Sequence, residues 1–274
     1  MEFQKYSGAG NTFLMINNLD GKIINHNDIT LELISMKGNE LFDGVIFLED
    51  SDIADFHMNY FNKDGSGNAL CGNGLRCTVK YILDNKISDK KIMAIEAVSK
   101  IYKTEIISDN LISVGFPPPD KIKMKFKLKV HFLDWWQLLT CSYIDVGSPH
   151  IVVFIDDIEK PEVKSIDVIP IDDWGRNIRM HKDLMPEGAN VNFVQIIPPE
   201  NGEISIRSYE RGVEGETQAC GTGALSAAII SYAQRQVKTP VKIKTKSGEY
   251  LIVDFKVVDN KIINLSLSGN ALRI

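Results

Sequence analysis

Two cysteines stand where glycine-rich loops lead into helical runs, one in each half of the chain. Cys71 opens CGNGLRCTVKYILD and Cys220 opens CGTGALSAAIISYAQ. A thiol at such an entrance lies near the unpaired backbone N–H groups and the positive end of the helix dipole, which favours the thiolate. One cysteine of this kind is typical of a nucleophile. Two of them predict two half-sites that face each other and exchange a proton.

Composition limits the classes of protein to which the chain can belong. Its 274 residues predict roughly two domains at about 150 residues each, and a net charge of −5 favours neither nucleic acid nor an anionic membrane as partner. No apolar stretch reaches the roughly 18 to 20 residues of a membrane span, and the start MEFQKYSGAGN has no signal-peptide pattern. A cytoplasmic location is expected. Four cysteines without a CxxC spacing predict free thiols, of which Cys77 and Cys141 are expected to be buried apolar residues.

The pattern of short strands and few helices predicts an α/β fold with mixed α+β sheets, in two pseudo-symmetric domains. Each domain is expected to be a curved sheet around a central helix, with the active site in the cleft between the two. Residues 1–117 form the first half with Cys71, residues 118–261 the second with Cys220, and the last strand, 262–274, is expected to pack back on the first. Helices are expected over residues 28–37 and after each of the two cysteines. Three prolines, 117–119, mark the linker.

A weak internal repeat supports this division. GAGNTFLMI at 8–16 is similar to VGSPHIVVFI at 146–155, and DGSGNALCGNG at 64–74 is similar to GVEGETQACGTG at 212–223. In each half, a glycine-containing turn at a strand start is followed by a Cys-Gly-x-Gly helix entrance. A different pattern covers residues 121–130, where lysines alternate with apolar residues. It predicts a lysine-protected edge strand with an apolar face on the core.

The motifs together resemble those of the diaminopimelate epimerase family, racemases that use no cofactor. The resemblance runs over nearly the whole chain, through KYSGAGNTF, FNKDGSGNALCGNGLRC, VGSPH, GRNIRMH, PEGANVNFVQ, YERGVEGETQACGTGA and SGNA. It implies interconversion of LL- and meso-2,6-diaminopimelate by two thiols, one acting as base and the other as acid. It also implies a small-molecule amino-acid substrate, a homodimer, and neither cofactor nor metal.

The resemblance also assigns roles to residues of this sequence. Cys71 and Cys220 are the expected acid and base, and His150 and Glu210 are expected beside them, where they tune proton transfer. Arg211 is expected to pair with the distal carboxylate, since a guanidinium offers it a planar fork. The other expected substrate-binding groups are backbone N–H groups and amide or hydroxyl side chains: Asn11, Asn62, Gly72, Asn73, Ser148, Asn190, Gly221 and Thr222.

Three positions and one inserted residue depart from the family pattern, and three rival functions stay open. Ser148 stands where many members have Asn, Gly67 where many have Glu, and Thr12 where many have Asp, and one residue is inserted between Glu210 and Cys220. Ser148 lacks the reach and dual function of an amide, so a racemase of another amino acid, such as glutamate or histidine, is the nearest alternative. A cysteine hydrolase that uses Cys220 and His150 would leave the Cys71 half-site without a role. A binding module of the same fold would not need two activated thiols.

Overall fold

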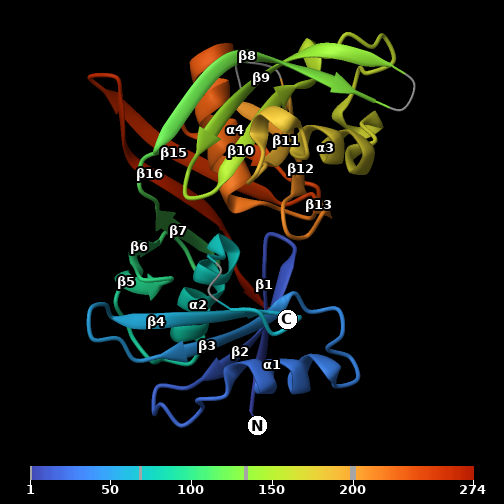
Figure 1. Ribbon diagram of the computed structural model, residues 1–274. Helices are drawn as coiled ribbons and strands as arrows, with labels where there is room; N and C mark the ends of the chain where they lie inside the picture. The colour runs from blue at the N-terminus through green and yellow to red at the C-terminus, as the bar shows by residue number, and fades with distance from the viewer. Residues whose placement is uncertain (1, 68–69, 133–134, 198–201) are drawn as a thin grey trace. The chain divides into compact units, whose positions relative to one another are not determined.

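The computed structural model describes residues 2–67, 70–132, 135–197 and 202–274 (Figure 1). Residues 68–69 of the DGSGNAL motif therefore lie outside the described part of the chain. The chain divides into two compact units. The first comprises residues 1–116 and 268–274, and the second comprises residues 117–267. The first break falls directly before Pro117, where the three prolines begin.

The first unit is built mainly of strands. Its helices are α1 (His26–Ser35) and α2 (Gly72–Asp84). Its strands are β1 (Gln4–Gly8), β2 (Asn11–Asn17), β3 (Gly44–Glu49), β4 (Phe56–Asn62), β5 (Ile92–Ala97), β6 (Lys100–Ile106), β7 (Leu111–Gly115) and the C-terminal β17 (Leu272–Arg273).

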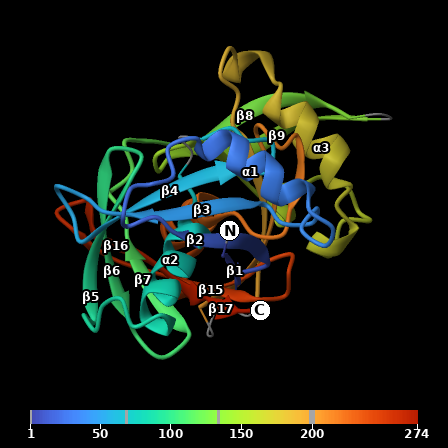
Figure 2. The ribbon, with the colours of Figure 1, turned by 90° about the horizontal axis from the view of Figure 1, so that it is seen from below.

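Helix α2 is the centre of this unit. It contacts β1, β2, β3, β4, β7 and β17, and Figure 2 shows these strands curving around it. Nine of its thirteen residues are buried, including Leu75, Val79 and Ile82. Their i, i+4 and i+7 spacing sets apolar side chains along one side of the helix, while Cys77 and Tyr81 fill the adjoining side. Because the sheet surrounds it, burial holds this helix in place, and with it the residue that begins it.

The second unit repeats the plan. Its α-helices are α3 (Ile171–Arg179) and α4 (Gly221–Arg235), with single 3₁₀ turns at Ile155–Asp157, Ile166–Val168 and Lys182–Leu184. Its strands are β8 (Lys121–His131), β9 (Trp136–Asp145), β10 (Pro149–Phe154), β11 (Asn190–Ile196), β12 (Glu203–Glu210), β13 (Gly215–Thr217), β14 (Val241–Lys244) and β15 (Tyr250–Val258), and β16 (Lys261–Asn270) leads back to the first unit. Helix α4 contacts β9, β10, β11, β12, β14 and β15 and is the central helix here.

Strand pairing follows the same order in both units. In the first, β1–β2 is antiparallel, β2–β3 parallel, β3–β4 antiparallel, β4–β5 parallel and β5–β6 antiparallel. In the second, β9–β10, β10–β11, β11–β12, β12–β14 and β14–β15 repeat this alternation. The central helix follows β4 in one unit and β13, after β12, in the other. The repeat inferred from the glycine-rich motifs is therefore a repeat of topology.

Strand β1 was not predicted, and two further elements differ from the sequence predictions. Helix α3 was not predicted because Gly175 interrupts a short segment, yet Ile171, Trp174 and Ile178 are buried. The apolar face predicted for 121–130 is wrong for its first half. Leu128 and Val130 are buried, but Ile122 and Met124 are 40% and 43% exposed. A bulge between Lys123 and Phe126 shifts the register there and breaks the alternation.

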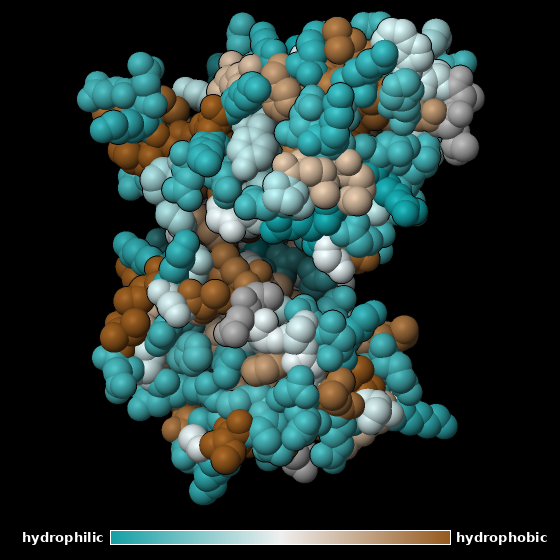
Figure 3. Space-filling model, in the orientation of Figure 1, coloured by the Kyte–Doolittle hydropathy of each residue, from teal (hydrophilic) through white to brown (hydrophobic). Residues whose placement is uncertain are grey.

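The surface of each unit is largely polar. In the view of Figure 3, hydrophilic residues cover most of both units, and apolar side chains form small separate patches. One set of exposed apolar side chains belongs to the β15–β16 hairpin and comprises Val257, Val258 and Ile263. Among the described residues, no helix is both long and apolar enough to cross a bilayer.

Candidate active site

The two helix entrances have the same local geometry. Cys71 and Cys220 are the N-cap residues of α2 and α4, with extended backbone at each. In both, the sulfur accepts a hydrogen bond from the backbone N–H three residues on: Gly74 N to Cys71 Sγ and Gly223 N to Cys220 Sγ, each at 3.3 Å. An N-cap side chain normally accepts this bond through oxygen. Here a thiol does so twice, at equivalent positions of two units.

Glycine at the third helical position makes room for the sulfur. A Cβ added at Gly223 would lie 2.4 Å from Asn192 Oδ1 and 3.2 Å from Cys220 Sγ, and one at Gly74 would lie 3.0 Å from Ile46 Cδ1 and 3.5 Å from Cys71 Sγ. A real side chain at Gly223 would have to displace the amide of Asn192. The Cys-Gly-x-Gly spacing is thus a packing requirement of the helix entrance as well as a chemical signature.

In the first unit, a row of polar side chains continues from the helix entrance. Asn73, 3% exposed, donates from Nδ2 to Asn11 Oδ1 at 2.5 Å, and its Oδ1 accepts from Arg76 at 2.6 Å. Asn11 begins β2 and donates to the Asp43 carboxylate at 3.3 Å. The structure therefore joins Asn11 and Asn73, two of the residues expected at the site. Arg76 and Asp43, which hold them, were not identified from the sequence.

Asn62 ends β4, and the Tyr60 hydroxyl links its side chain to the backbone carbonyl of Asp43. Its side chain accepts from the Tyr60 hydroxyl at 2.8 Å and donates to Ser66 Oγ at 3.0 Å. Ser66 in turn donates to Asp64 within the same turn. The amide of Asn62 is thus oriented by its own strand and turn.

In the second unit, Cys220 pairs with a carboxylate. Glu210 ends β12, as Asn62 ends β4, and it accepts hydrogen bonds from Cys220 and from the Thr217 hydroxyl. Cys220 is 6% exposed. Burial and then the Glu210 charge raise the pKa of Cys220 well above the usual thiol range, and burial also raises the pKa of Glu210. Burial and a neighbouring anion outweigh the helix terminus at Cys220, so the thiol is favoured there.

Four of the expected residues form a hydrogen-bonded series that ends at Cys220. His150 is on β10 and is fully buried. Its Nε2 lies 3.0 Å from Ser148 Oγ. Ser148 donates to Thr222 Oγ1 at 3.3 Å, and Thr222 Oγ1 is 3.6 Å from Cys220 Sγ. Burial, followed by the Arg211 charge, lowers the pKa of His150 to about 3. His150 is therefore neutral at physiological pH and has the hydrogen-bonding capacity of an uncharged imidazole.

Asn190 connects this series to Arg211. Its Oδ1 accepts from the Arg211 backbone N–H at 2.8 Å, and its Nδ2 donates to the Pro149 carbonyl at 3.2 Å. The Arg211 side chain is exposed and donates to the Glu187 carbonyl at 3.2 Å. Asn190 is 6% exposed. The amide therefore fixes the turn that carries the guanidinium, whose hydrogen-bond acceptor in the described part of the chain is the Glu187 carbonyl.

The remaining two expected residues are glycines, which have only backbone groups to offer a substrate. Gly72 and Gly221 are the first residues of α2 and α4, and with Asn73 and Thr222 they supply N–H groups that no carbonyl of their own helix can accept. Such groups at a helix N-terminus bind carboxylates well. Each unit thus presents a thiol next to a place for negative charge.

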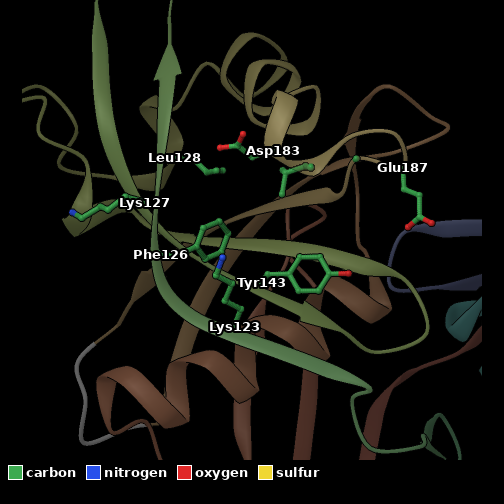
Figure 4. Close-up of a pocket in the computed structure, with 9 residues that line it drawn as sticks. Lys123, Phe126, Lys127, Leu128, Tyr143, Asp183 and Glu187 are labelled. Carbon is green, nitrogen blue, oxygen red and sulfur yellow. The ribbon is translucent and has the colours of Figure 1, made fainter.

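A hollow of about 420 Å³ in the second unit contains none of the residues expected at the site (Figure 4). Its walls carry charges of both signs, from Lys123, Lys127, Asp183 and Glu187, around the rings of Phe126 and Tyr143. In Figure 4, the Lys127 ammonium and the Glu187 carboxylate point to opposite sides of the hollow. This mixture favours no single class of charged ligand. No cluster of three or more metal-ligating side chains occurs in the described ranges.

The family model and the most similar relatives that were compared carry the same family description. A family model described as diaminopimelate epimerase matches residues 3–121 and 142–271. The diaminopimelate epimerase of Aquifex aeolicus (strain VF5) is 36% identical over 267 residues, with 93% of this chain and 90% of the relative covered. That of Chlorobaculum tepidum is 35% identical over 258 residues, with 93% of each chain covered.

Solved structures share the fold at low sequence identity. A Bacillus anthracis phenazine biosynthesis protein of the PhzF family has a TM-score of 0.72 at 15% identity, with 100% of this chain and 98% of that chain covered. A probable proline racemase from Agrobacterium radiobacter K84 has a TM-score of 0.68 at 12% identity, covering 99% and 90%. These likenesses confirm the predicted mixed α/β fold.

Proposed function

The chain belongs to the diaminopimelate epimerase family, and we propose that it interconverts LL- and meso-2,6-diaminopimelate by proton transfer at Cα between two cysteine side chains. One observation supports this most strongly. Two central helices at equivalent places in two repeated units each begin at a cysteine whose sulfur accepts the same backbone hydrogen bond. A single nucleophile would need one such entrance, whereas inversion needs an acid and a base on opposite faces of the carbon.

The first step removes the α-proton. In one direction, the thiolate of one cysteine takes the proton from Cα, the electron pair delocalises into the α-carboxylate, and the thiol of the other cysteine gives a proton to the opposite face. The product leaves with the two sulfurs in exchanged protonation states. No oxidant or reductant is needed, because one proton is removed and one is returned.

Glu210 serves as the local proton acceptor for Cys220. The buried thiol donates a hydrogen bond to this half-buried carboxylate. When the proton moves to Glu210, Cys220 becomes the thiolate that takes the α-proton. Glu210 keeps its proton during that turnover, and in the reverse direction the Cys220 thiol gives its proton to Cα and is left as the thiolate beside protonated Glu210. Because burial raises the pKa of Glu210 as well as that of Cys220, this carboxylate is a better proton acceptor than an exposed one.

The substrate's charges match groups of this chain. We assign the α-carboxylate to the backbone N–H groups of Gly72, Asn73, Gly221 and Thr222, where the helix dipoles stabilise the negative charge that develops. We assign the distal carboxylate to the guanidinium of Arg211, and other polar groups of the substrate to the amides of Asn11, Asn62 and Asn190 and the hydroxyl of Ser148. A substrate with two carboxylates uses all of these groups.

The experiment is a substrate comparison with purified enzyme and no added pyridoxal phosphate. We expect LL-diaminopimelate to be converted to the meso form, and L-glutamate and L-histidine to be unchanged at the same enzyme concentration. Activity that favours glutamate or histidine would contradict the assignment of the substrate, and activity lost on removal of pyridoxal phosphate would contradict the cofactor-free chemistry. In the cell, this reaction belongs to lysine biosynthesis and the supply of peptidoglycan precursors. We expect a cytoplasmic homodimer, and light scattering of the purified protein tests the dimer.

A further inference from the structure

The imidazole of His150 lies between two asparagine amides. Asn192 Nδ2 is 2.9 Å from His150 Nδ1, and Asn190 Nδ2 is 3.4 Å from His150 Nε2. An amide nitrogen is only a donor, so a ring nitrogen that it faces closely has to be an acceptor. A neutral imidazole has one N–H and one acceptor nitrogen. The geometry must therefore select which nitrogen carries the proton.

The orientation of Asn192 is fixed by two further hydrogen bonds. Its Nδ2 also donates to the Ile151 carbonyl at 3.2 Å, and its Oδ1 accepts from the Ser208 hydroxyl at 2.8 Å. A backbone carbonyl can only accept, so the reversed amide would set two oxygens against each other. Asn192 is fully buried and cannot exchange these partners for water. The donor side of its amide therefore faces His150 Nδ1.

The other ring nitrogen has a group that can accept. His150 Nε2 is 3.0 Å from Ser148 Oγ, nearer than it is to Asn190 Nδ2. A proton on Nε2 satisfies both close contacts of the ring, whereas a proton on Nδ1 would point at the Asn192 amide nitrogen at 2.9 Å. The Nε2–H form also leaves the Ser148 hydroxyl free to donate onward to Thr222 Oγ1, which lies 3.6 Å from Cys220 Sγ.

We propose that Asn192 is a positioning residue that holds His150 in its neutral Nε2–H form, so that Ser148 and Thr222 direct a hydrogen-bond donor at Cys220 Sγ. A donor aimed at sulfur stabilises the thiolate relative to the thiol. The inference rests on the proposed function for the role of Cys220 as a proton carrier. It makes His150 a fixed donor and leaves the proton transfers to Cys220 and Glu210.

The charged and titratable groups around Cys220 make such a donor necessary. From the end of β12, the Glu210 carboxylate opposes ionisation of the thiol, and burial acts in the same direction. The Gly223 N–H and the Thr222 hydroxyl of α4 act the other way. His150 on β10 adds no charge, because burial and the Arg211 guanidinium keep it neutral. The hydrogen-bonded series from Asn192 to Thr222 thus offsets part of the rise in the pKa of Cys220 that Glu210 causes.

The tautomer can be measured without substrate. In the full-length protein labelled with ¹⁵N-histidine, long-range ¹H–¹⁵N correlation spectra distinguish Nε2–H, Nδ1–H and imidazolium rings, and His150→Gln identifies the His150 signals among five histidines. We expect Nε2–H throughout pH 6 to 8. An Nδ1–H ring, or an imidazolium in this range, would overturn the inference.

Substitutions test the role of Asn192. Asn192→Asp replaces the donor by an acceptor, and we expect His150 to change to the Nδ1–H or imidazolium form. The rate at which iodoacetamide alkylates Cys220 is measured by peptide mapping at several pH values. Near neutral pH we expect this rate to fall about tenfold, because the thiolate loses one hydrogen bond. Ser208→Ala is the matched control, because it removes a partner of Asn192 Oδ1 but leaves both bonds from Nδ2. It should keep the Nε2–H form and an alkylation rate within twofold.

A double-mutant cycle separates this route from a direct charge effect. If Asn192 acts through Ser148, Asn192→Asp should change the Cys220 alkylation rate by less than twofold in a Ser148→Ala background. Additive effects, or an Nε2–H ring retained in Asn192→Asp, would overturn the inference. If Asn192→Asp does not fold, the wild-type tautomer and the alkylation of Ser148→Ala still decide it. Because neither measurement uses turnover, a protein with the expected tautomer but no epimerase activity would contradict only the proposed function.

Discussion

Cys220, which is buried, and Glu210, which is half-buried, form a pair in which the thiol donates a hydrogen bond to the carboxylate. Burial raises the pKa of each group, and the negative charge of Glu210 raises that of Cys220 further. The resting pair therefore holds its proton on sulfur. A protonated thiol can act as the acid, and it becomes a base when the carboxylate takes its proton. This relationship gives Glu210 a role that can be tested separately from that of the thiol.

Glu210→Gln should have opposite effects on turnover and on thiol reactivity. The amide cannot take the Cys220 proton, so we expect kcat to fall by about 10²-fold or more. The substitution also removes the negative charge that raises the pKa of Cys220. Alkylation of Cys220 by iodoacetamide at fixed neutral pH should therefore become faster as turnover becomes slower. Steady-state kinetics and peptide mapping of the same preparation measure the two effects.

Glu214→Gln is the matched control for Glu210. Glu214 lies on the same turn, but its carboxylate is exposed and pairs with Arg179 at 3.0 Å. We expect both turnover and Cys220 alkylation to stay within twofold. A Glu210→Gln enzyme whose turnover and alkylation both fall would show a disturbed fold around the helix entrance instead of a lost proton acceptor.

Arg211→Lys should weaken substrate binding although it keeps the charge. The exposed guanidinium can give a carboxylate two parallel hydrogen bonds, and an ammonium cannot. We expect kcat/KM for LL-diaminopimelate to fall about tenfold or more, mainly through KM. Arg273→Lys, at the exposed C-terminal β17, makes the same chemical change outside the proposed site. A loss of less than about threefold in Arg211→Lys would exclude the assignment to the distal carboxylate.

Glu49 predicts how the stability of the first unit depends on pH. Burial alone would raise the pKa of Glu49, but hydrogen bonds from His57, His26, Asn18 and Asn59 outweigh it and lower the pKa to about 2. The stabilisation is therefore present above the unfolded pKa of about 4.3 and is lost as pH falls toward 2. Glu49 raises the pKa of His57. The contribution of His57 to stability is therefore fully present below about pH 6.5 and is lost as pH rises through the raised pKa.

Glu49→Gln should therefore destabilise this unit most between about pH 4.3 and 6.5, by up to about 3 kcal/mol. All three tryptophans lie in the second unit, so their fluorescence does not report on this change. Hydrogen exchange of peptides from β3 and β4 is the direct measurement. Asp50→Asn, which removes an exposed carboxylate at the next position, is the control. Equal destabilisation at pH 2 and pH 5.5 would refute the account.

The central helices and the topological repeat could be read from the sequence because local chemistry specifies them. A cysteine followed by Gly-x-Gly and an apolar run predicts an N-cap and a buried helix whatever surrounds it. Strand β1 (Gln4–Gly8) and helix α3 (Ile171–Arg179) could not be read in this way. Gly175 allows α3 to approach β12, where a Cβ would lie 2.5 Å from Tyr209 Cβ, so tertiary packing forms this helix against its own low propensity.

The partners of the site residues were the least predictable part. Ser148 and Thr222 are distant in sequence, and their hydroxyls meet only because β10 lies beside α4. Asn192 could have been suspected from the NVNF pattern, since alternate residues of a strand share a face and Asn190 is two positions before it. The raised pKa of Cys220 depends on burial next to Glu210, which no local spacing reveals.

The most direct test of the two-thiol mechanism is proton exchange at Cα. Purified enzyme without pyridoxal phosphate is incubated with LL-diaminopimelate in deuterated water, and the early meso product is analysed by mass spectrometry. We expect one deuterium at the inverted Cα, because the returned proton comes from a thiol equilibrated with solvent, and neither Cys71→Ala nor Cys220→Ala should form meso product. Meso product without deuterium, or near wild-type epimerisation in either alanine variant, would contradict the mechanism.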